Sequence, residues 1–113
     1  MKRTALKLRK FAKKRKWDQF HSPKNLACSI CVESSELLEL FQWSQGTKWS
    51  DLKNRKLRKR VEEELADIFL YLLRFADKGG FDLVKAADSK LQVNAKKYPV
   101  SKSRGNDAKY TDL

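Results

Sequence analysis

Apolar residues recur at every third or fourth position along most of this chain, and this spacing predicts α-helices. The clearest case is the segment V-E-E-E-L-A-D-I-F-L-Y-L-L at Val61–Leu73. Read as a helix with the residues before it, it carries an apolar stripe on one face: Leu57, Val61, Leu65, Ile68 and Leu72. Runs that alternate apolar and polar residues are few, and the chain has only two prolines and four glycines. These features argue against a sheet and predict an all-α protein.

Capping residues divide the first half of the chain into two helices. We expect a basic N-terminal helix within residues 1–20, where Lys and Arg are interleaved with apolar residues. Ser22 can cap the free amides of a following helix, and Pro23 suits its first turn. That second helix should run to about Trp43. Its expected core contacts are Leu26, Ala27, Ile30, Leu37, Leu38 and Phe41.

The third helix should contain the apolar stripe described above. Residues 45–48, Q-G-T-K, interrupt the apolar pattern before it. Ser50 or Asp51 can cap a helix that extends to about Asp77. The glycine pair at 79–80 then favours the end of that helix.

A fourth helix is expected from Asp82 to about Lys97, because Asp is a favourable N-terminal cap. The residues that should face inward are Leu83, Val84, Ala87, Leu91 and Ala95. The sequence turns polar afterwards, so residues 100–113 are expected to be an irregular tail. We expect one domain over residues 1–113, whose small core would gain from oligomerisation.

The net charge indicates an anionic partner. The formal charge is +12, from 26 Lys and Arg against 14 Asp and Glu. Nucleic acid, a phosphate-rich small molecule and an acidic surface all fit this charge. For the basic segment at residues 2–16, a solvated helix face is the simpler interpretation than a nucleic-acid or membrane arm.

The sequence predicts a cytoplasmic protein without a membrane anchor. No apolar run approaches the length that spans a bilayer, and the N-terminus lacks the uninterrupted apolar core of a secretion signal. Cys28 and Cys31 have no second Cys or His pair to complete a zinc site. We therefore expect two small thiols packed within a helix.

Two carboxylate pairs interrupt the apolar segments at helical spacing. Glu33 and Glu36 lie one turn apart, and so do Glu64 and Asp67. Either pair alone fits an exposed charge pair or a salt bridge equally well. Two pairs within apolar helices favour a metal site, because like carboxylates near an apolar surface raise each other's pKa unless a cation neutralises them. Hard oxygen ligands favour Mg²⁺, with Mn²⁺ as a substitute. The single histidine, His21, forms no Glu-x-x-His motif of the di-iron type.

Five segments occur in a characteristic order: F-A-K-K-R-K-W-D-Q-F-H-S-P-K-N-L, E-S-S-E-L-L-E-L-F-Q-W, E-E-L-A-D-I-F-L-Y-L, N-A-K-K-Y-P and K-Y-T-D-L. This order resembles the MazG-like all-α nucleotide pyrophosphohydrolases, and within them the dCTP pyrophosphatase branch. The resemblance implies a four-helix bundle completed by oligomerisation, as a homodimer or homotetramer. It also implies Mg²⁺-dependent cleavage of a dNTP between the α and β phosphates, with dCTP or a modified dCTP preferred, in nucleotide-pool sanitation.

The resemblance further implies residue roles. The catalytic metal ligands would be Glu33, Glu36, Glu64 and Asp67, with the general base unassigned. The base and sugar pocket would be formed by Trp17, His21, Trp43 and Tyr71. Phosphate or sugar would be held by Lys90, Asn94, Lys97 and Tyr98. Two alternatives stay open: a broad or non-cytosine specificity, for example for dUTP, and a non-catalytic basic protein that binds nucleic acid or regulates.

Overall fold

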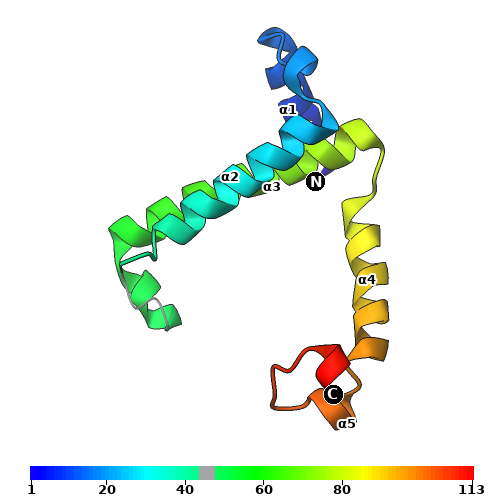
Figure 1. Ribbon diagram of the computed structural model, residues 1–113. Helices are drawn as coiled ribbons and strands as arrows, with labels where there is room; N and C mark the ends of the chain where they lie inside the picture. The colour runs from blue at the N-terminus through cyan, green and yellow to red at the C-terminus, as the bar shows by residue number, and fades with distance from the viewer. Residues whose placement is uncertain (44–47) are drawn as a thin grey trace. The chain divides into compact units, whose positions relative to one another are not determined.

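A computed structural model of the chain describes residues 1–43 and 48–113 (Figure 1). The described residues form helices and no strand, so the predicted all-α class is confirmed. The elements are α1 (Lys2–Lys14), η1 (Asp18–Phe20), α2 (Pro23–Glu39), η2 (Trp49–Lys53), α3 (Arg55–Gly79), α4 (Leu83–Lys97), α5 (Val100–Ser103) and η3 (Tyr110–Asp112), where η denotes a 3₁₀-helix. In this part of the chain, no helix is both long and apolar enough to cross a bilayer.

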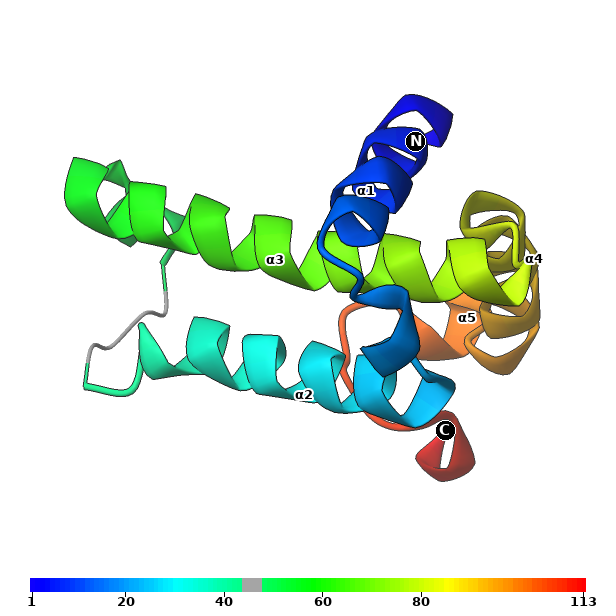
Figure 2. The same cartoon turned by 90° about the horizontal axis from the view of Figure 1, so that it is seen from above.

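The helices form two compact units, Met1–Gly80 and Phe81–Leu113, which are described separately below. The single domain expected over residues 1–113 stays a prediction. In the first unit, α2 and α3 run side by side as a helical hairpin, and α1 packs across α3 (Figure 2). The side chains buried between these helices are Ala12, Leu26, Val61, Leu73, Arg74 and Ala76.

A tight turn joins α1 to η1 and positions Trp17. Lys16 has a left-handed backbone, with φ of 54°, just after the end of α1. The Trp17 amide donates to the Ala12 carbonyl at 3.0 Å, and the Lys16 amide donates to the Lys13 carbonyl at 3.1 Å. This pair of bonds is the Schellman motif of helix C-termini. The motif reverses the chain so that the Trp17 ring meets the edge of Phe11, with 5.6 Å between centroids.

The start of α2 is confirmed, whereas its predicted end at Trp43 is wrong. The Ser22 hydroxyl accepts a hydrogen bond from the Asn25 amide at 3.1 Å, as expected for a cap. The helix ends at Glu39. The amides of residues 40–42 bond to carbonyls three residues back rather than four, so the backbone tightens into turns before Trp43. Of the predicted break at 45–48, residues 45–47 lie outside the described residues.

The cap predicted for α3 is also wrong, and its end is confirmed to within two residues. Ser50 and Asp51 lie in the 3₁₀-helix η2, and the cap of α3 is Asn54, whose side-chain oxygen accepts from the Leu57 amide at 3.1 Å. Asn caps as well as Ser or Asp, so propensity alone does not choose among them. The helix ends at Gly79, and Gly80 adopts the left-handed conformation with φ of 72°.

The second unit contains α4 and a partly helical C-terminal segment. Asp82 caps α4 through a bond from the Lys85 amide at 3.0 Å, and α4 ends at Lys97, both as predicted. The irregular tail expected at 100–113 is only partly observed, because α5 and η3 form there. The Tyr110 ring stabilises this segment through an edge contact with Tyr98 and a contact with the Lys97 ammonium, 4.7 Å from the ring centroid. The apolar residues of α4 that were expected to face inward are not buried.

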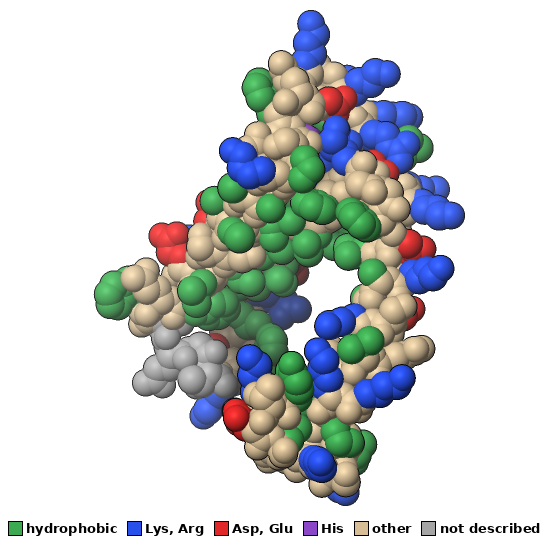
Figure 3. Space-filling model, turned by 45° about the vertical axis from the view of Figure 1, so that its right-hand side comes forward, with side chains coloured by type: hydrophobic (Ala, Val, Ile, Leu, Met, Phe, Trp, Pro, Cys, Tyr) green, Lys and Arg blue, Asp and Glu red, His purple; other side chains and the backbone are tan. Residues whose placement is uncertain are grey.

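Several predicted core residues of the first unit are exposed. Val61 and Leu26 are buried as expected, but Leu65 is 50% exposed and Leu38 is 70% exposed. Two helices in contact cover only one side of each other, which leaves part of their apolar side chains exposed. Figure 3 shows hydrophobic side chains gathered over this hairpin. Cys28 and Cys31 are also exposed, which corrects the expectation of packed thiols.

Candidate metal centre and adjoining pocket

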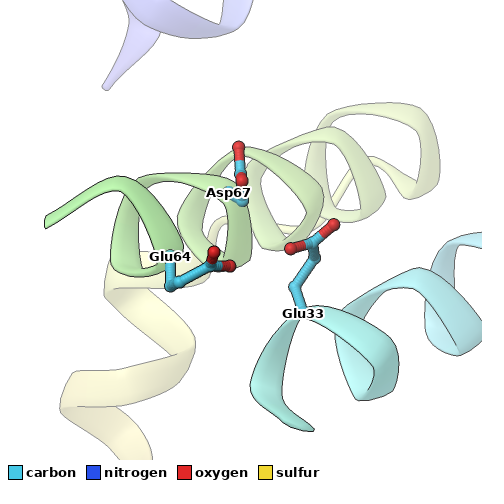
Figure 4. A group of neighbouring side chains, drawn as sticks. All are labelled: Glu33, Glu64 and Asp67. Carbon is cyan, nitrogen blue, oxygen red and sulfur yellow. The ribbon is translucent and has the colours of Figure 1, made fainter. Parts of the chain in front are cut away.

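Three of the four predicted carboxylates meet between α2 and α3. Glu33 projects from α2 toward α3, where Glu64 and Asp67 lie one turn apart (Figure 4). One ligand atom from each residue lies within 4.8 Å of the others. The three-residue spacing on α3 places Glu64 and Asp67 on the same side of that helix, and the hairpin brings Glu33 opposite them.

The centre concentrates negative charge, and two of its oxygens lack a hydrogen-bond partner among the described residues. These two oxygens are Glu33 Oε2 and Glu64 Oε2, and both are buried. Burial raises the pKa of Glu33 to about 7, helped by a hydrogen bond with Glu36 and by the charges of Glu36, Asp67 and Glu64. Burial and the same neighbours also raise the pKa of Glu64. These carboxylates therefore fit a divalent cation, which would supply the missing positive charge to hard oxygen donors.

Glu36, the fourth predicted carboxylate, lies beside this group of three. It is half-buried, and it contributes both a hydrogen bond and a negative charge to the raised pKa values of Glu33 and Glu64. It does not belong to the set whose oxygens lie within 4.8 Å of one another. The structure thus brings three predicted residues into one centre and places Glu36 at its margin.

A pocket of about 240 Å³ adjoins the centre and includes two of its carboxylates. Glu33 and Asp67 line it together with three of the aromatic residues singled out from the sequence, Trp17, His21 and Tyr71. The remaining lining residues are Leu8, Phe11, Ala12, Leu70 and Arg74. Acidic oxygens and flat aromatic surfaces thus share one cavity that has predominantly apolar walls, as ligand pockets commonly do.

A second pocket, also among the described residues of the first unit, has a different character. Its volume is about 390 Å³, and its lining residues are Leu37, Phe41, Lys48, Trp49, Leu52, Val61 and Leu65. No carboxylate lines it. Although it is larger, it lacks the groups that could hold a cation, so we place the candidate site at the smaller pocket.

The remaining predicted site residues lie elsewhere. Trp43 follows the early end of α2, and its side chain is 92% exposed and does not line the acidic pocket. If α2 continued to Trp43, this ring would lie on the same helix face as Glu36. Because the helix ends at Glu39 and turns follow, Trp43 does not share that face. The residues predicted to hold phosphate or sugar all belong to the second unit: Lys90, Asn94, Lys97 and Tyr98.

Sequence reasoning missed Arg74, which lines the pocket and is only 3% exposed. Its side chain forms an ion pair with Asp18 and donates to His21. One signal could have indicated it, because Asp67, Tyr71 and Arg74 follow the i, i+4, i+7 spacing of a single helix face. The spacing marks a shared face, but only the packing of α1 and η1 shows that this face is covered.

These features define a class of protein: an all-α chain with a carboxylate centre between two paired helices and an aromatic pocket beside it. The sequence model of the MazG-like family matches residues 28–113. The chain belongs to the MazG-like family, and the resemblance read from its sequence is confirmed.

Relatives with known names agree with this assignment. The chain is 43% identical to dCTP pyrophosphatase 1 of Mus musculus in an alignment of 108 residues that covers 91% of this chain and 61% of that protein. It is 38% identical to dCTP pyrophosphatase 1 of Homo sapiens, with the same shares covered. The chain therefore spans less than two thirds of these relatives. A crystal structure of a pyrophosphatase from Archaeoglobus fulgidus superposes with a TM-score of 0.74 at 42% identity, covering 81% of this chain and 85% of that one.

Proposed function

We propose that this protein is a Mg²⁺-dependent nucleoside triphosphate pyrophosphohydrolase that cleaves a dNTP, preferably dCTP or a modified dCTP, to dNMP and pyrophosphate. The observation that carries the proposal is the single pocket lined both by Glu33 and Asp67 and by Trp17, His21 and Tyr71. Carboxylates suit a cation that binds phosphates, and aromatic rings suit a nucleobase. The names of the mouse and human relatives support the same substrate. Nucleotide-pool sanitation in the cytoplasm is the role that we expect for such an enzyme.

Glu33, Glu64 and Asp67 would hold the metal directly, with Glu36 as a fourth ligand or a proton acceptor beside them. Mg²⁺ is the expected ion, and Mn²⁺ is its expected substitute, because all donors are hard oxygens. When bound, the cation supplies Lewis-acid polarisation of phosphoryl oxygens and lowers the pKa of water.

The other pocket residues bind and orient the nucleotide. Trp17 and Tyr71 provide surface on which a pyrimidine can stack, and His21 provides a hydrogen bond at the base edge. Leu8, Phe11 and Leu70 exclude bulk water, which strengthens the electrostatic contacts inside the pocket. A glutamate of the centre that is not fully engaged as a ligand accepts the proton of the attacking water.

The proposal also assigns roles to residues of the second unit and to further copies of this chain. Lys90, Asn94, Lys97 and Tyr98 offer cations and hydrogen-bond donors for phosphate or sugar oxygens. We expect a homodimer or homotetramer, because apolar side chains of α2 and α3, Leu38 and Leu65 among them, are exposed in one chain. Trp43 would join the pocket from such an assembly.

The decisive experiment measures pyrophosphate release from dCTP by the full chain, with Mg²⁺ and with a chelator. Glu36→Gln and Asp67→Asn should each lower kcat/KM by on the order of 100-fold, the scale of one lost transition-state contact. Glu62→Gln is the matched control, because Glu62 lies on α3 but is exposed and pairs with Arg58. Variants that retain both helical content and full activity would remove the metal assignment.

A substrate panel separates the cytosine preference from a broader specificity. kcat/KM for dCTP, 5-methyl-dCTP, dUTP, dTTP and ATP should be highest for the cytosine nucleotides. A flat profile would favour the broad alternative.

The cationic surface of α1 supports a second candidate function, nucleic-acid binding without catalysis. The helix contains no acidic residue, and among the described residues Arg9 is its only cation in an ion pair. Salt-sensitive binding to DNA or RNA, together with no pyrophosphate release from any nucleotide, would favour this candidate.

A further inference from the structure

Arg74 holds His21 in one defined chemical state. Arg74 is 3% exposed, and its Nε–H donates to His21 Nδ1 at 3.1 Å. A guanidinium can only donate hydrogen bonds, so Nδ1 must be the acceptor and must carry no proton. A neutral imidazole has one N–H, and this N–H is therefore at Nε2.

The surrounding charges fix the guanidinium and keep His21 neutral. Arg74 Nη2 forms an ion pair with Asp18, and Arg74 Nη1 lies 4.0 Å from Asp77 Oδ2. Burial lowers the pKa of His21, and the positive charges of Arg74 and Lys78 lower it further, against the opposing charge of Asp18. The other charged groups that line the same pocket are Glu33 and Asp67, whereas α1 contributes only the apolar side chains of Leu8, Phe11 and Ala12.

We propose that Arg74 is a positioning residue that presents His21 to the pocket as a fixed Nε2–H donor and thereby selects a base whose ring nitrogen accepts a hydrogen bond. This inference rests on the proposed function and deepens it. N3 of cytosine is an acceptor, whereas N3 of uracil and of thymine carries a hydrogen. The Nε2–H of His21 can pair with N3 of cytosine. Against uracil or thymine it would face the N3–H, and both donors would be left unpaired.

The contact also explains why an arginine is buried at this position. A buried cation is costly unless its donors are engaged. Here Asp18 balances the charge by pairing with Nη2, and His21 accepts from the Nε–H of the same guanidinium. The same guanidinium thus links η1, which carries Asp18, to α3 and to the pocket.

The chemical state of His21 can be measured directly, because it is the only histidine in the chain. The full-length protein, labelled with ¹⁵N histidine, should show an unprotonated Nδ1 and a protonated Nε2 at neutral pH. A wild-type spectrum with the proton on Nδ1 would overturn the proposal without any variant. This readout needs no turnover, so it fails or succeeds independently of the proposed enzymatic function.

Arg74→Met removes the donor. In this variant the two nitrogen signals of His21 should move toward each other, because both tautomers become populated, and the pKa of His21 should rise. Leaving Asp18 unpaired can impair folding, so Arg74→Met combined with Asp18→Asn removes both charges and serves as the second test. Arg9→Met is the matched control, because it removes another arginine next to Asp77 without contacting His21. Signals that are unchanged in both Arg74 variants would contradict the proposal.

Base selectivity gives the functional readout. We expect the ratio of kcat/KM for dCTP to that for dUTP to fall roughly 10-fold in the Arg74 variants, the scale of one neutral hydrogen bond. The loss of selectivity should appear mainly as a higher KM for dCTP, and the pH profile of kcat/KM for dCTP should change. Arg9→Met should leave the ratio of kcat/KM values unchanged. An unchanged ratio in a folded, active Arg74 variant would show that the arginine has only a structural role. If no variant and no wild-type sample releases pyrophosphate, the proposed function fails, and the histidine spectrum still decides the role of Arg74.

Discussion

Arg9 on α1 and Asp77 on α3 form a two-pronged ion pair, with 2.9 Å from Nε to Oδ2 and 2.7 Å from Nη2 to Oδ1. The two residues are 68 positions apart in the chain. The hydrogen bond from Arg9 lowers the pKa of Asp77 below its ordinary value of 3.8, although burial opposes the shift. The pair therefore connects the basic first helix to the helix that carries Glu64 and Asp67.

This ion pair should make the attachment of α1 sensitive to acid. Because the pKa of Asp77 is lower in the folded state, its stabilising contribution is complete above the ordinary value of 3.8 and is lost as pH falls through the folded-state pKa. We expect Asp77→Asn to lower the free energy of unfolding at pH 7. The difference in this free energy between the variant and the wild type should become smaller in acid. Urea unfolding at several pH values measures this difference. Asp88→Asn, at an exposed site on α4, should show no such difference.

Replacing Lys16 should stabilise the protein. Its left-handed backbone, with φ of 54°, is strained for a residue that has a Cβ atom. We expect Lys16→Gly to raise the free energy of unfolding by about 1 kcal/mol. Lys16→Ala removes the same charge but keeps the strain, so it should leave stability nearly unchanged. Equal gains from both variants in urea unfolding would attribute the effect to charge instead.

Leu26 should be the most sensitive apolar position of the first unit. It is 2% exposed, and Leu26→Ala would lose about 2–5 kcal/mol through lost burial and a residual cavity. Leu38→Ala, at an exposed position of the same helix, should cost little in the isolated chain. If Leu38 is covered in an oligomer, its variant should instead show an unfolding midpoint that depends on protein concentration. Equal losses at both positions, independent of concentration, would contradict the observed burial.

Binding of a divalent cation should release protons near neutral pH. The pKa of Glu33 is about 7, because burial and its acidic neighbours disfavour the charged form. Without metal, the folded protein binds more protons than the unfolded chain, so its stability should decline as pH rises from about 4.5 to about 7. Calorimetry of Mg²⁺ binding in two buffers of different ionisation enthalpy should detect roughly half a proton released at pH 7.

The controls for this prediction are Glu33→Gln, which should reduce the proton release, and Glu62→Gln, which should retain it. Mg²⁺ affinity that is constant from pH 6 to pH 8 would contradict the raised pKa.

Local sequence signals succeeded where a single side chain decides the outcome. Ser22 and Asp82 each cap a helix by accepting a bond from the amide three residues later, and both helix starts were predicted from that chemistry alone. The signals failed where several residues compete for one role. Asn54, and not Ser50 or Asp51, caps α3, because the preceding residues form a 3₁₀-helix. Trp43 lies outside the helix because the backbone tightens into turns after the end of α2, and the apolar periodicity of the sequence does not reveal this.

The sequence by itself determined the all-α class, the helix that carries Glu64 and Asp67, and the spacing of the second acidic pair, Glu33 and Glu36, since these depend on spacing within a helix. Only the tertiary structure decided that Glu33 meets Glu64 and Asp67, and that Glu33 and Asp67 line a pocket with Trp17 and Tyr71. It also decided that Arg74 fixes His21 within that pocket. Periodicity specifies which residues share a face of one helix. The pairing of that face with another helix depends on the packing of residues far apart in the chain, which no local pattern encodes.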